Sequence, residues 1–276
     1  MPPLHVNGAT LWYEEHGAGP ETVVFAHGLL WSGRMFDAQV AELADRFRCV
    51  TFDFRGQGRS EVTAGGYDLE TLSDDAAALI EALGCAPCHF VGLSMGGFIG
   101  MRLAARRPEL VRSLVLMETS ADAEPAANVP RYRLLGGIVR MLGTFGMRLV
   151  MPRVMRIMFG RTFLEDPARD AERRLWRERG MANRPRGVTR ALRGVIERKP
   201  IHGELGKIAV PTLVMVGDED VATVPAKAER IHAAIPGSRL VVIPGAGHTS
   251  SVEQPELVNA ALEGFLASVT AAATPV

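Results

Sequence analysis

The chain has 276 residues, enough for one large α/β domain or one domain with an insertion, with a sizeable buried core. Its 31 basic and 31 acidic residues balance, so no overall field favours nucleic acid or a membrane surface, and a small, roughly neutral partner fits better. The chain does not open with a basic region followed by an apolar one, and no apolar run reaches the roughly 18 residues of a membrane span. We therefore expect a cytoplasmic protein that binds neither nucleic acid nor membranes.

Short apolar runs alternate with longer amphipathic stretches, the pattern of a mostly parallel sheet covered by helices. We predict eight strands, at residues 4–7, 10–15, 22–26, 48–53, 88–93, 113–118, 211–216 and 239–243. Helices are predicted between most of them, at about residues 35–45, 69–83, 95–106, 225–234 and 255–268. The expected fold is an α/β structure, a mostly parallel eight-stranded twisted sheet with helices on both faces.

Residues 122–206 interrupt this alternation and are called the lid segment below. They hold 17 of the chain's 28 arginines, one lysine, nine acids and six of its 12 methionines, and they show no strand pattern. We predict a helical lid inserted into a core domain of residues 1–121 and 207–276. The arginines fit solvated helix surfaces. A second interpretation is that apolar lid side chains line a pocket, and the candidates are Met141, Leu142 and Phe145.

Three cysteines, Cys49, Cys85 and Cys88, are an odd number and too few for a disulfide framework in a chain of this length. Cys85 and Cys88 form a CxxC pattern, which is redox-active where it opens a helix. Here the pattern follows a predicted helix and leads into a strand, so reduced structural thiols fit better.

The stretch GLSMG, residues 92–96, has G-x-S-x-G spacing and falls where an apolar strand gives way to a helix. That is the context of a nucleophile elbow, a strained turn in which glycines permit close backbone approach and the Ser94 hydroxyl stands clear. The helix that follows also favours negative charge developing at its N-terminus. Alone, the pentapeptide is equally compatible with an ordinary strand-to-helix turn.

A serine hydroxyl needs a base at neutral pH, and His248 is the best placed of seven histidines. It lies in a glycine-rich loop after the last predicted strand and can reach the carboxyl edge of the sheet. Three acids, Asp218, Glu219 and Asp220, follow the preceding strand, and one of them could orient the imidazole. The order serine, acid, histidine is that of the α/β hydrolases. No histidine pair has metal-ligand spacing, so we propose no metal.

Nearly the whole chain resembles the α/β-hydrolase superfamily, and within it the esterase, enol-lactonase and cofactor-free perhydrolase group. The resemblance rests on four motifs in order: HGLLWSG at 27–33, FDFRGQGRS at 52–60, GLSMGG at 92–97, and GDED with GAGH between 217 and 248. Related enzymes that open epoxides or displace halide use aspartate at the elbow, and this chain has serine there.

The resemblance implies a role for each candidate residue. It selects Asp220 as the triad acid, since this acid stands three residues after the glycine that ends its strand; Glu118 occupies a position where a few members keep theirs. It implies that the amides of Leu29 and Met95 form the oxyanion hole. Residues beside the oxyanion loop, Leu30 and Trp31, are expected to line the substrate pocket, and Trp31 could equally be structural. His27, Asp53 and Arg55 are expected to brace their loops.

The sequence thus predicts a cofactor-free serine hydrolase that cleaves a small, largely apolar ester or lactone through an acyl-enzyme. The same triad could instead serve carbon–carbon bond hydrolysis, perhydrolysis or acyl transfer. A non-catalytic binding protein on this scaffold is a further alternative, although every triad position is filled. The expected partner is a small-molecule substrate, and a homodimer is possible.

Overall fold

The computed structural model describes residues 3–273. Its strands are β1 (Leu4–Val6), β2 (Ala9–Leu11), β3 (Tyr13–His16), β4 (Thr22–Ala26), β5 (Arg48–Phe52), β6 (Cys88–Leu93), β7 (Val111–Met117), β8 (Thr212–Gly217) and β9 (Arg239–Ile243). Its α-helices are α1 (Asp37–Leu43), α2 (Leu69–Ala82), α3 (Met95–Arg106), α4 (Val129–Met158), α5 (Arg161–Glu165), α6 (Asp170–Met181), α7 (Pro185–Ile196), α8 (Pro225–Ala234), α9 (Ser250–Glu253) and α10 (Pro255–Ala273). Short 3₁₀ turns lie at Gly33–Phe36, Pro108–Leu110, Pro167–Arg169 and His202–Lys207.

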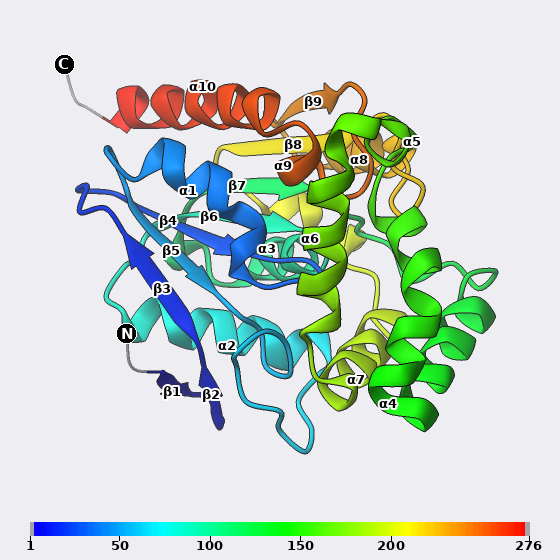
Figure 1. Ribbon diagram of the computed structural model, residues 1–276. Helices are drawn as coiled ribbons and strands as arrows, with labels where there is room; N and C mark the ends of the chain where they lie inside the picture. Colours follow the sequence, from blue (N-terminus) through cyan, green and yellow to red (C-terminus); the bar gives the residue numbers. More distant parts are fainter. Residues whose placement is uncertain (1–2, 274–276) are drawn as a thin grey trace.

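The predicted mostly parallel sheet is confirmed (Figure 1). Among the described residues, seven strands form the main sheet in the order β3-β5-β4-β6-β7-β8-β9, and only β3 runs antiparallel to its neighbour. The first predicted strand instead pairs with β2 in a separate hairpin. Asn7 and Gly8 join these two strands with φ of 46° and 70°, the positive values that a tight two-residue hairpin turn requires.

The second predicted strand, 10–15, is divided at Trp12 into β2 and β3. The Trp12 backbone N–H leaves the strand ladder and donates to Ser60 Oγ at 2.8 Å. This change of partner lets β2 pair with β1 while β3 joins the edge of the main sheet, so one predicted strand serves two sheets.

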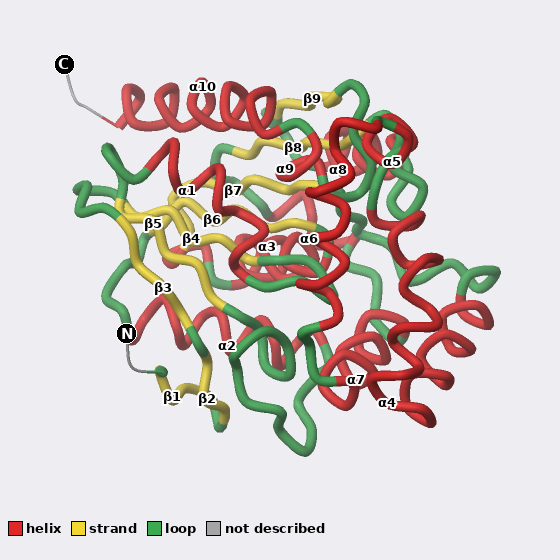
Figure 2. The backbone as a smooth tube through the Cα atoms, in the orientation of Figure 1, coloured by secondary structure: helices red, strands yellow, loops and turns green. Residues whose placement is uncertain are grey.

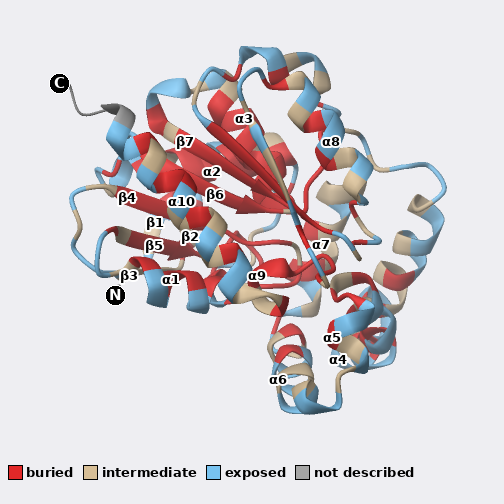
Figure 3. Ribbon diagram, turned by 90° about the horizontal axis from the view of Figure 1, so that it is seen from above, coloured by how far each residue is buried: buried red, intermediate tan, exposed pale blue. Residues whose placement is uncertain are grey.

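Both faces of the central strands of the main sheet are buried, as their continuous apolar sequences require, whereas the edge strands β3 and β9 are partly exposed (Figure 3). Alternate side chains of β4 point to opposite faces. Val24 and Ala26 join a core cluster with α2, α3 and α8, whereas Val23 and Phe25 join a second cluster with α1 and α10. The second cluster also takes in side chains of α4 and α6, so the lid segment packs on the same core.

The lid segment, between β7 and β8, consists of helices and loops in the structure (Figure 2). Its longest helix, α4, is broken at Gly143, whose φ of 58° and ψ of −133° are not helical. Gly146 then allows the second half to approach the first, because a Cβ there would lie 2.5 Å from the Ile138 carbonyl oxygen. The two halves of α4 therefore fold against each other, with residues 141–145 at the bend.

Candidate active site

Ser94 occupies a strained turn between β6 and α3. Its φ of 52° and ψ of −106° lie outside the regions that non-glycine residues ordinarily adopt. A Cβ on Gly92 would lie 2.4 Å from the backbone of Gly96, and one on Gly96 would lie 2.0 Å from the Ala26 carbonyl oxygen. The two glycines are thus required by close backbone approach, and the turn holds the Ser94 side chain at the carboxyl edge of the sheet.

Two residues from later strands meet at the same edge. Asp220 follows β8 and His248 follows β9, and Asp220 Oδ2 accepts a hydrogen bond from His248 Nδ1 at 2.9 Å. Both side chains are almost fully buried. The imidazole therefore has one nitrogen engaged by a carboxylate, which leaves the other ring nitrogen for proton transfer.

A turn holds the Asp220 carboxylate in place. Its Oδ1 accepts from the backbone N–H groups of Ala222 and Thr223 at 2.7 and 2.9 Å, and its Oδ2 also accepts from Thr223 Oγ1 at 2.7 Å. Burial alone would raise the pKa of Asp220, but the neighbouring His248 and the hydrogen bonds from His248 and Thr223 outweigh it and lower the pKa below its ordinary value. The carboxylate is thereby held in its charged form.

The other candidate acids have different partners. Asp218 accepts from the Gly245 N–H at 2.8 Å, and Glu219 accepts from the Thr162 N–H and hydroxyl at 2.8 and 2.7 Å. Glu118 is fully buried, and within residues 3–273 neither of its carboxyl oxygens has a hydrogen-bond partner. Burial raises the pKa of Glu118 well above its ordinary value, and nearby carboxylates add to the effect. Only Asp220 of these four lies against His248.

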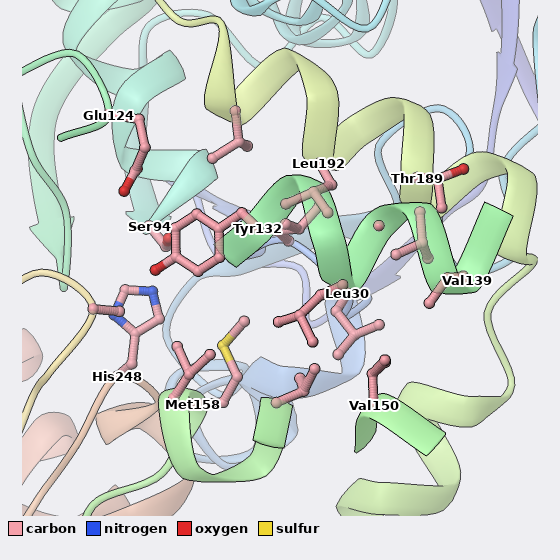
Figure 4. A pocket seen from close by; sticks show the side chains of 18 of the residues that line it. Leu30, Ser94, Glu124, Tyr132, Val139, Val150, Met158, Thr189, Leu192 and His248 are labelled. Atoms are coloured by element: carbon pink, nitrogen blue, oxygen red, sulfur yellow. The ribbon is translucent and has the colours of Figure 1, made fainter. Parts of the chain in front are cut away.

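Ser94 and His248 open on one cavity of about 130 Å³. Figure 4 shows both side chains at its edge, with side chains of α4 and α7 around the remainder. The walls that the lid segment supplies are mainly apolar and include Leu135, Val139, Met147, Val150, Val154 and Met158. The reactive groups therefore face a small apolar space, which is the usual character of a ligand site.

The loop after β4 also reaches this cavity, to which Leu29 and Leu30 contribute. Leu30 has a φ of 76°, its N–H donates to Gln57 Oε1 at 2.6 Å, and its carbonyl accepts from Asn183 Nδ2 at 2.6 Å. These bonds hold the loop beside the cavity. Met95 is the first residue of α3, where a backbone N–H has no acceptor within the helix.

Comparison with known proteins identifies the family of the chain. The family model described as alpha/beta hydrolase fold matches residues 21–255. The chain belongs to the α/β hydrolase family. A putative non-heme bromoperoxidase, BpoC, from Mycobacterium tuberculosis is 36% identical over 95% of this chain and 99% of its own length.

Two solved structures are also similar. One is a thermophilic esterase from Thermogutta terrifontis, with a TM-score of 0.87 and 30% identity over 95% of this chain and 94% of that one. The other is the enol-lactonase from Burkholderia xenovorans LB400, with a TM-score of 0.87 and 29% identity over 96% of this chain and 100% of that one. The chain is therefore an enzyme of the α/β hydrolase superfamily, in the group of esterases, lactonases and perhydrolase-like proteins.

The prediction that Met141, Leu142 and Phe145 line the substrate pocket is wrong. They are 79%, 45% and 62% exposed and lie at the bend of α4, away from the cavity that Ser94 shares. The physical reason is the break at Gly143, which turns the bend at residues 141–145 outward. The lid does line the cavity, but with side chains on either side of the bend.

Trp31 does not line the cavity of this hydrolase either, so its interpretation as a pocket wall is wrong. It is 2% exposed and packs edge-on against Trp176, at 5.3 Å between ring centroids, and against Phe159 at 5.9 Å. Those two rings come from the lid segment, so Trp31 joins the lid to the core instead. Leu30, predicted with it, does contribute to the cavity.

The bracing residues form buried contacts away from the cavity. His27 Nε2 accepts from the Phe54 N–H at 3.0 Å, and burial lowers the pKa of His27, which favours the neutral ring needed for that bond. Asp53 accepts from the Gly33 N–H at 2.8 Å. Arg55 and Asp75 form a buried ion pair. These groups hold the loops on which the hydrolase site is built.

Sequence reasoning missed several polar groups at the cavity. The Tyr132 hydroxyl points toward Ser94 and His248 (Figure 4). Glu124 and Arg198, from opposite ends of the lid segment, form a nearly buried ion pair at 2.7 Å on the cavity wall. No local sequence pattern predicts these contacts, because they depend on how the lid segment folds. Thr223 is different, since an aspartate followed by a threonine three residues later is a recognisable turn signal.

A further carboxylate joins the lid to the histidine loop. Glu253 accepts from the backbone N–H groups of Gly160, Gly247 and Thr249 at 2.7 to 3.0 Å. Burial raises the pKa of Glu253 to about 7, although the three amides oppose the shift. Two of these amides, those of Gly247 and Thr249, flank His248, so Glu253 fixes the position of His248 relative to the lid segment.

Two other kinds of centre, a metal site and a reactive thiol, find no support among the described residues. Within residues 3–273, no set of three or more His, Cys, Asp or Glu side chains could hold a metal ion. The three cysteines are free and buried, and burial raises the pKa of each thiol. Thiols in this environment are poor nucleophiles, which argues against a redox role for Cys85 and Cys88.

Proposed function

We propose that the protein is a serine hydrolase that cleaves small, apolar carboxylic esters or lactones through an acyl-enzyme. The observation that carries this proposal is the arrangement of Ser94 and His248 on one apolar cavity, with Asp220 hydrogen-bonded to the imidazole nitrogen Nδ1. The similarity to an esterase and an enol-lactonase supports the same reaction class.

In the proposed mechanism, His248 Nε2 takes the hydroxyl proton as Ser94 Oγ attacks the substrate carbonyl. The amides of Leu29 and Met95 stabilise the oxyanion that forms. His248 then protonates the leaving alcohol, and the acyl group stays on Ser94. Water, activated by the same imidazole, releases the acid. Asp220, charged because its pKa is lowered, stabilises the imidazolium in both steps.

The cavity limits the acyl group. Its volume of about 130 Å³ is close to that of apolar protein cavities that hold one benzene-sized molecule. A short-chain or small cyclic acyl group fits this space, and the apolar lid walls favour hydrocarbon over charged substituents. The buried Glu124–Arg198 ion pair offers polar contacts at one wall, where a lactone or ester oxygen could be received.

Trimming a cavity wall should change acyl preference. Val150 is buried and lines the cavity, so Val150→Ala should raise kcat/KM for a butanoate ester relative to an acetate ester by about 10-fold. Phe145→Ala is the matched control, because Phe145 belongs to the same helix but is exposed at its bend. Ratios of kcat/KM across a series of p-nitrophenyl esters measure the effect. An equal shift in both variants would contradict the cavity assignment.

Perhydrolysis is the second candidate, favoured by the name of the mycobacterial relative, a putative non-heme bromoperoxidase. In that reaction hydrogen peroxide attacks the acyl-enzyme in place of water, the bond between Ser94 Oγ and the acyl carbon breaks, and a peracid leaves. The proton from peroxide returns to Ser94 through His248. Both candidates share the acyl-enzyme and differ in the molecule that resolves it.

A fluorophosphonate probe tests the shared intermediate. It should label one residue per chain, and mass spectrometry of the digested protein should find the adduct on Ser94. A panel of p-nitrophenyl esters and lactones, run beside bromide oxidation in acetate with hydrogen peroxide, separates the two candidates. Rapid ester or lactone turnover with little peroxide-dependent bromination supports the hydrolase. Absence of labelling in an active preparation contradicts the serine mechanism itself.

A further inference from the structure

The outward face of α4 carries large apolar side chains that nothing within residues 3–273 covers. Leu134, Met141 and Phe145 are 65%, 79% and 62% exposed, and Leu142 and Leu149 are also exposed. Scattered single apolar residues are common on surfaces, whereas large exposed apolar patches mark interaction sites. We call this surface, with the arginines described next, the outer α4 face.

The exposed surface of α4 is also strongly cationic. Residues 129–158 contain no acid, and all six arginines of this stretch are exposed: Arg131, Arg133, Arg140, Arg148, Arg153 and Arg156. None of the six forms an ion pair with another residue of the described chain. On neighbouring α6, Arg177 and Glu178 border the groove beside Phe145. The outer α4 face therefore combines exposed hydrocarbon with an excess of positive charge. Glu178 borders the groove of Arg148, and Glu165 and Glu219 border that of Arg156.

The surroundings of α4 decide between three kinds of partner. Among the described residues it is the one helix that is long and apolar enough to span a bilayer, but its inward side chains, such as Leu135 and Met147, pack in the core, so it lies along the surface. A second copy placed symmetrically on this face would oppose one set of six arginines to another. Nucleic acid would neutralise the arginines and leave the apolar side chains without a partner.

We propose that the outer α4 face docks on an anionic phospholipid surface. Helices that lie in a membrane interface carry arginine on a polar face and Phe or Leu beside it, which is the composition found here. The balanced charge of the whole chain conceals this surface, because the compensating acids lie elsewhere. Docking would place the inward side of α4, which lines the Ser94 cavity, next to a layer where apolar esters concentrate.

Vesicle flotation of the full-length Ser94→Ala protein tests the proposal without lipid hydrolysis. Phosphatidylglycerol–phosphatidylcholine vesicles should carry the protein, and pure phosphatidylcholine vesicles should carry much less. Binding should weaken as salt is raised, since exposed charges are screened. Because the assay needs no catalysis, its outcome does not depend on the proposed function.

Two α4 variants, each with a matched control, locate the surface. Replacing Arg140, Arg148 and Arg153 with Gln should lower the partition coefficient of the protein onto anionic vesicles about 100-fold. Each arginine near an anionic bilayer contributes about fivefold to this coefficient. Replacing the exposed Arg34, Arg46 and Arg193 with Gln removes the same charge outside α4 and should lower partitioning far less. Phe145→Ser should weaken binding at high salt, whereas Val242→Ser, also at an exposed apolar site, should not.

Unchanged thermal unfolding establishes that each variant is folded. The proposal is overturned if the protein fails to float with anionic vesicles, or if the control arginine set matters as much as the α4 set. It is also overturned if Phe145→Ser abolishes a dimer seen by size exclusion and leaves vesicle binding intact, because the face would then bind a second copy.

Discussion

Replacing Ser94 with alanine should lower kcat for ester hydrolysis by about 10⁶-fold, the loss seen when the nucleophile of a serine triad is removed. The reason is that in the proposed mechanism the acyl-enzyme forms on Ser94 Oγ, and the elbow residues 92–96 contain no other hydroxyl. The backbone should tolerate the change, since alanine at a φ of 52° is strained to a similar degree as serine. Initial rates with a p-nitrophenyl ester, together with the melting temperature, measure both effects.

Ser268→Ala is the control for this experiment. Ser268 lies on α10, where its hydroxyl donates to the Phe265 carbonyl oxygen at 2.7 Å, far along the chain from the elbow. It should retain the parent kcat. If folded Ser94→Ala protein, shown free of parent enzyme, kept a substantial fraction of the rate, a different nucleophile would have to be sought.

Asp220→Asn should lower kcat by about 10⁴-fold, because the amide no longer holds the imidazole in the tautomer that accepts the serine proton. Asp218→Asn is the matched control: it makes the same chemical change two residues away, at a carboxylate that accepts from the Gly245 N–H. That variant should stay within a few-fold of the parent. Steady-state kinetics on both, with one ester substrate, give the comparison.

Equal and small losses in the two variants would contradict the assignment and point to Glu118. The structure argues against this outcome, since burial raises the pKa of Glu118 and favours its neutral form, which cannot stabilise an imidazolium. A double variant, Asp220→Asn with Glu118→Gln, separates the cases. No further loss beyond the single Asp220 change is expected.

Local patterns were sufficient for much of the fold. The helix predicted at 95–106 is α3 to the residue, and that at 225–234 is α8, because each has helical periodicity and a clear boundary in the elbow serine or in a first-turn proline. The strands of the main sheet were also recognisable, since buried parallel strands are continuous apolar runs. The division at Trp12 was not, because a strand's own sequence does not specify its pairing partner.

The site residues, like the fold, fall into those that the sequence indicates and those that only the folded chain selects. Ser94 and His248 are the candidates that the sequence singles out, because the elbow needs glycines at fixed spacing and a base for it is expected after the last strand. Asp218, Glu219 and Asp220 all follow the same strand, and the resemblance favoured Asp220 among them. The turn that ends at Thr223 is what directs that one carboxylate toward the imidazole in the folded chain.

By itself, the sequence determined the fold class, the elbow and the order of the catalytic candidates, since these depend on spacing along a few consecutive residues. Only the tertiary structure decided which lid side chains face the cavity. Both sides of α4 are rich in apolar residues, so periodicity cannot tell the buried side from the exposed one. The break at Gly143 and the close approach at Gly146 turn Phe145 to the surface and Val150 inward. Contacts between segments distant in the sequence settle that choice, and no local pattern contains them.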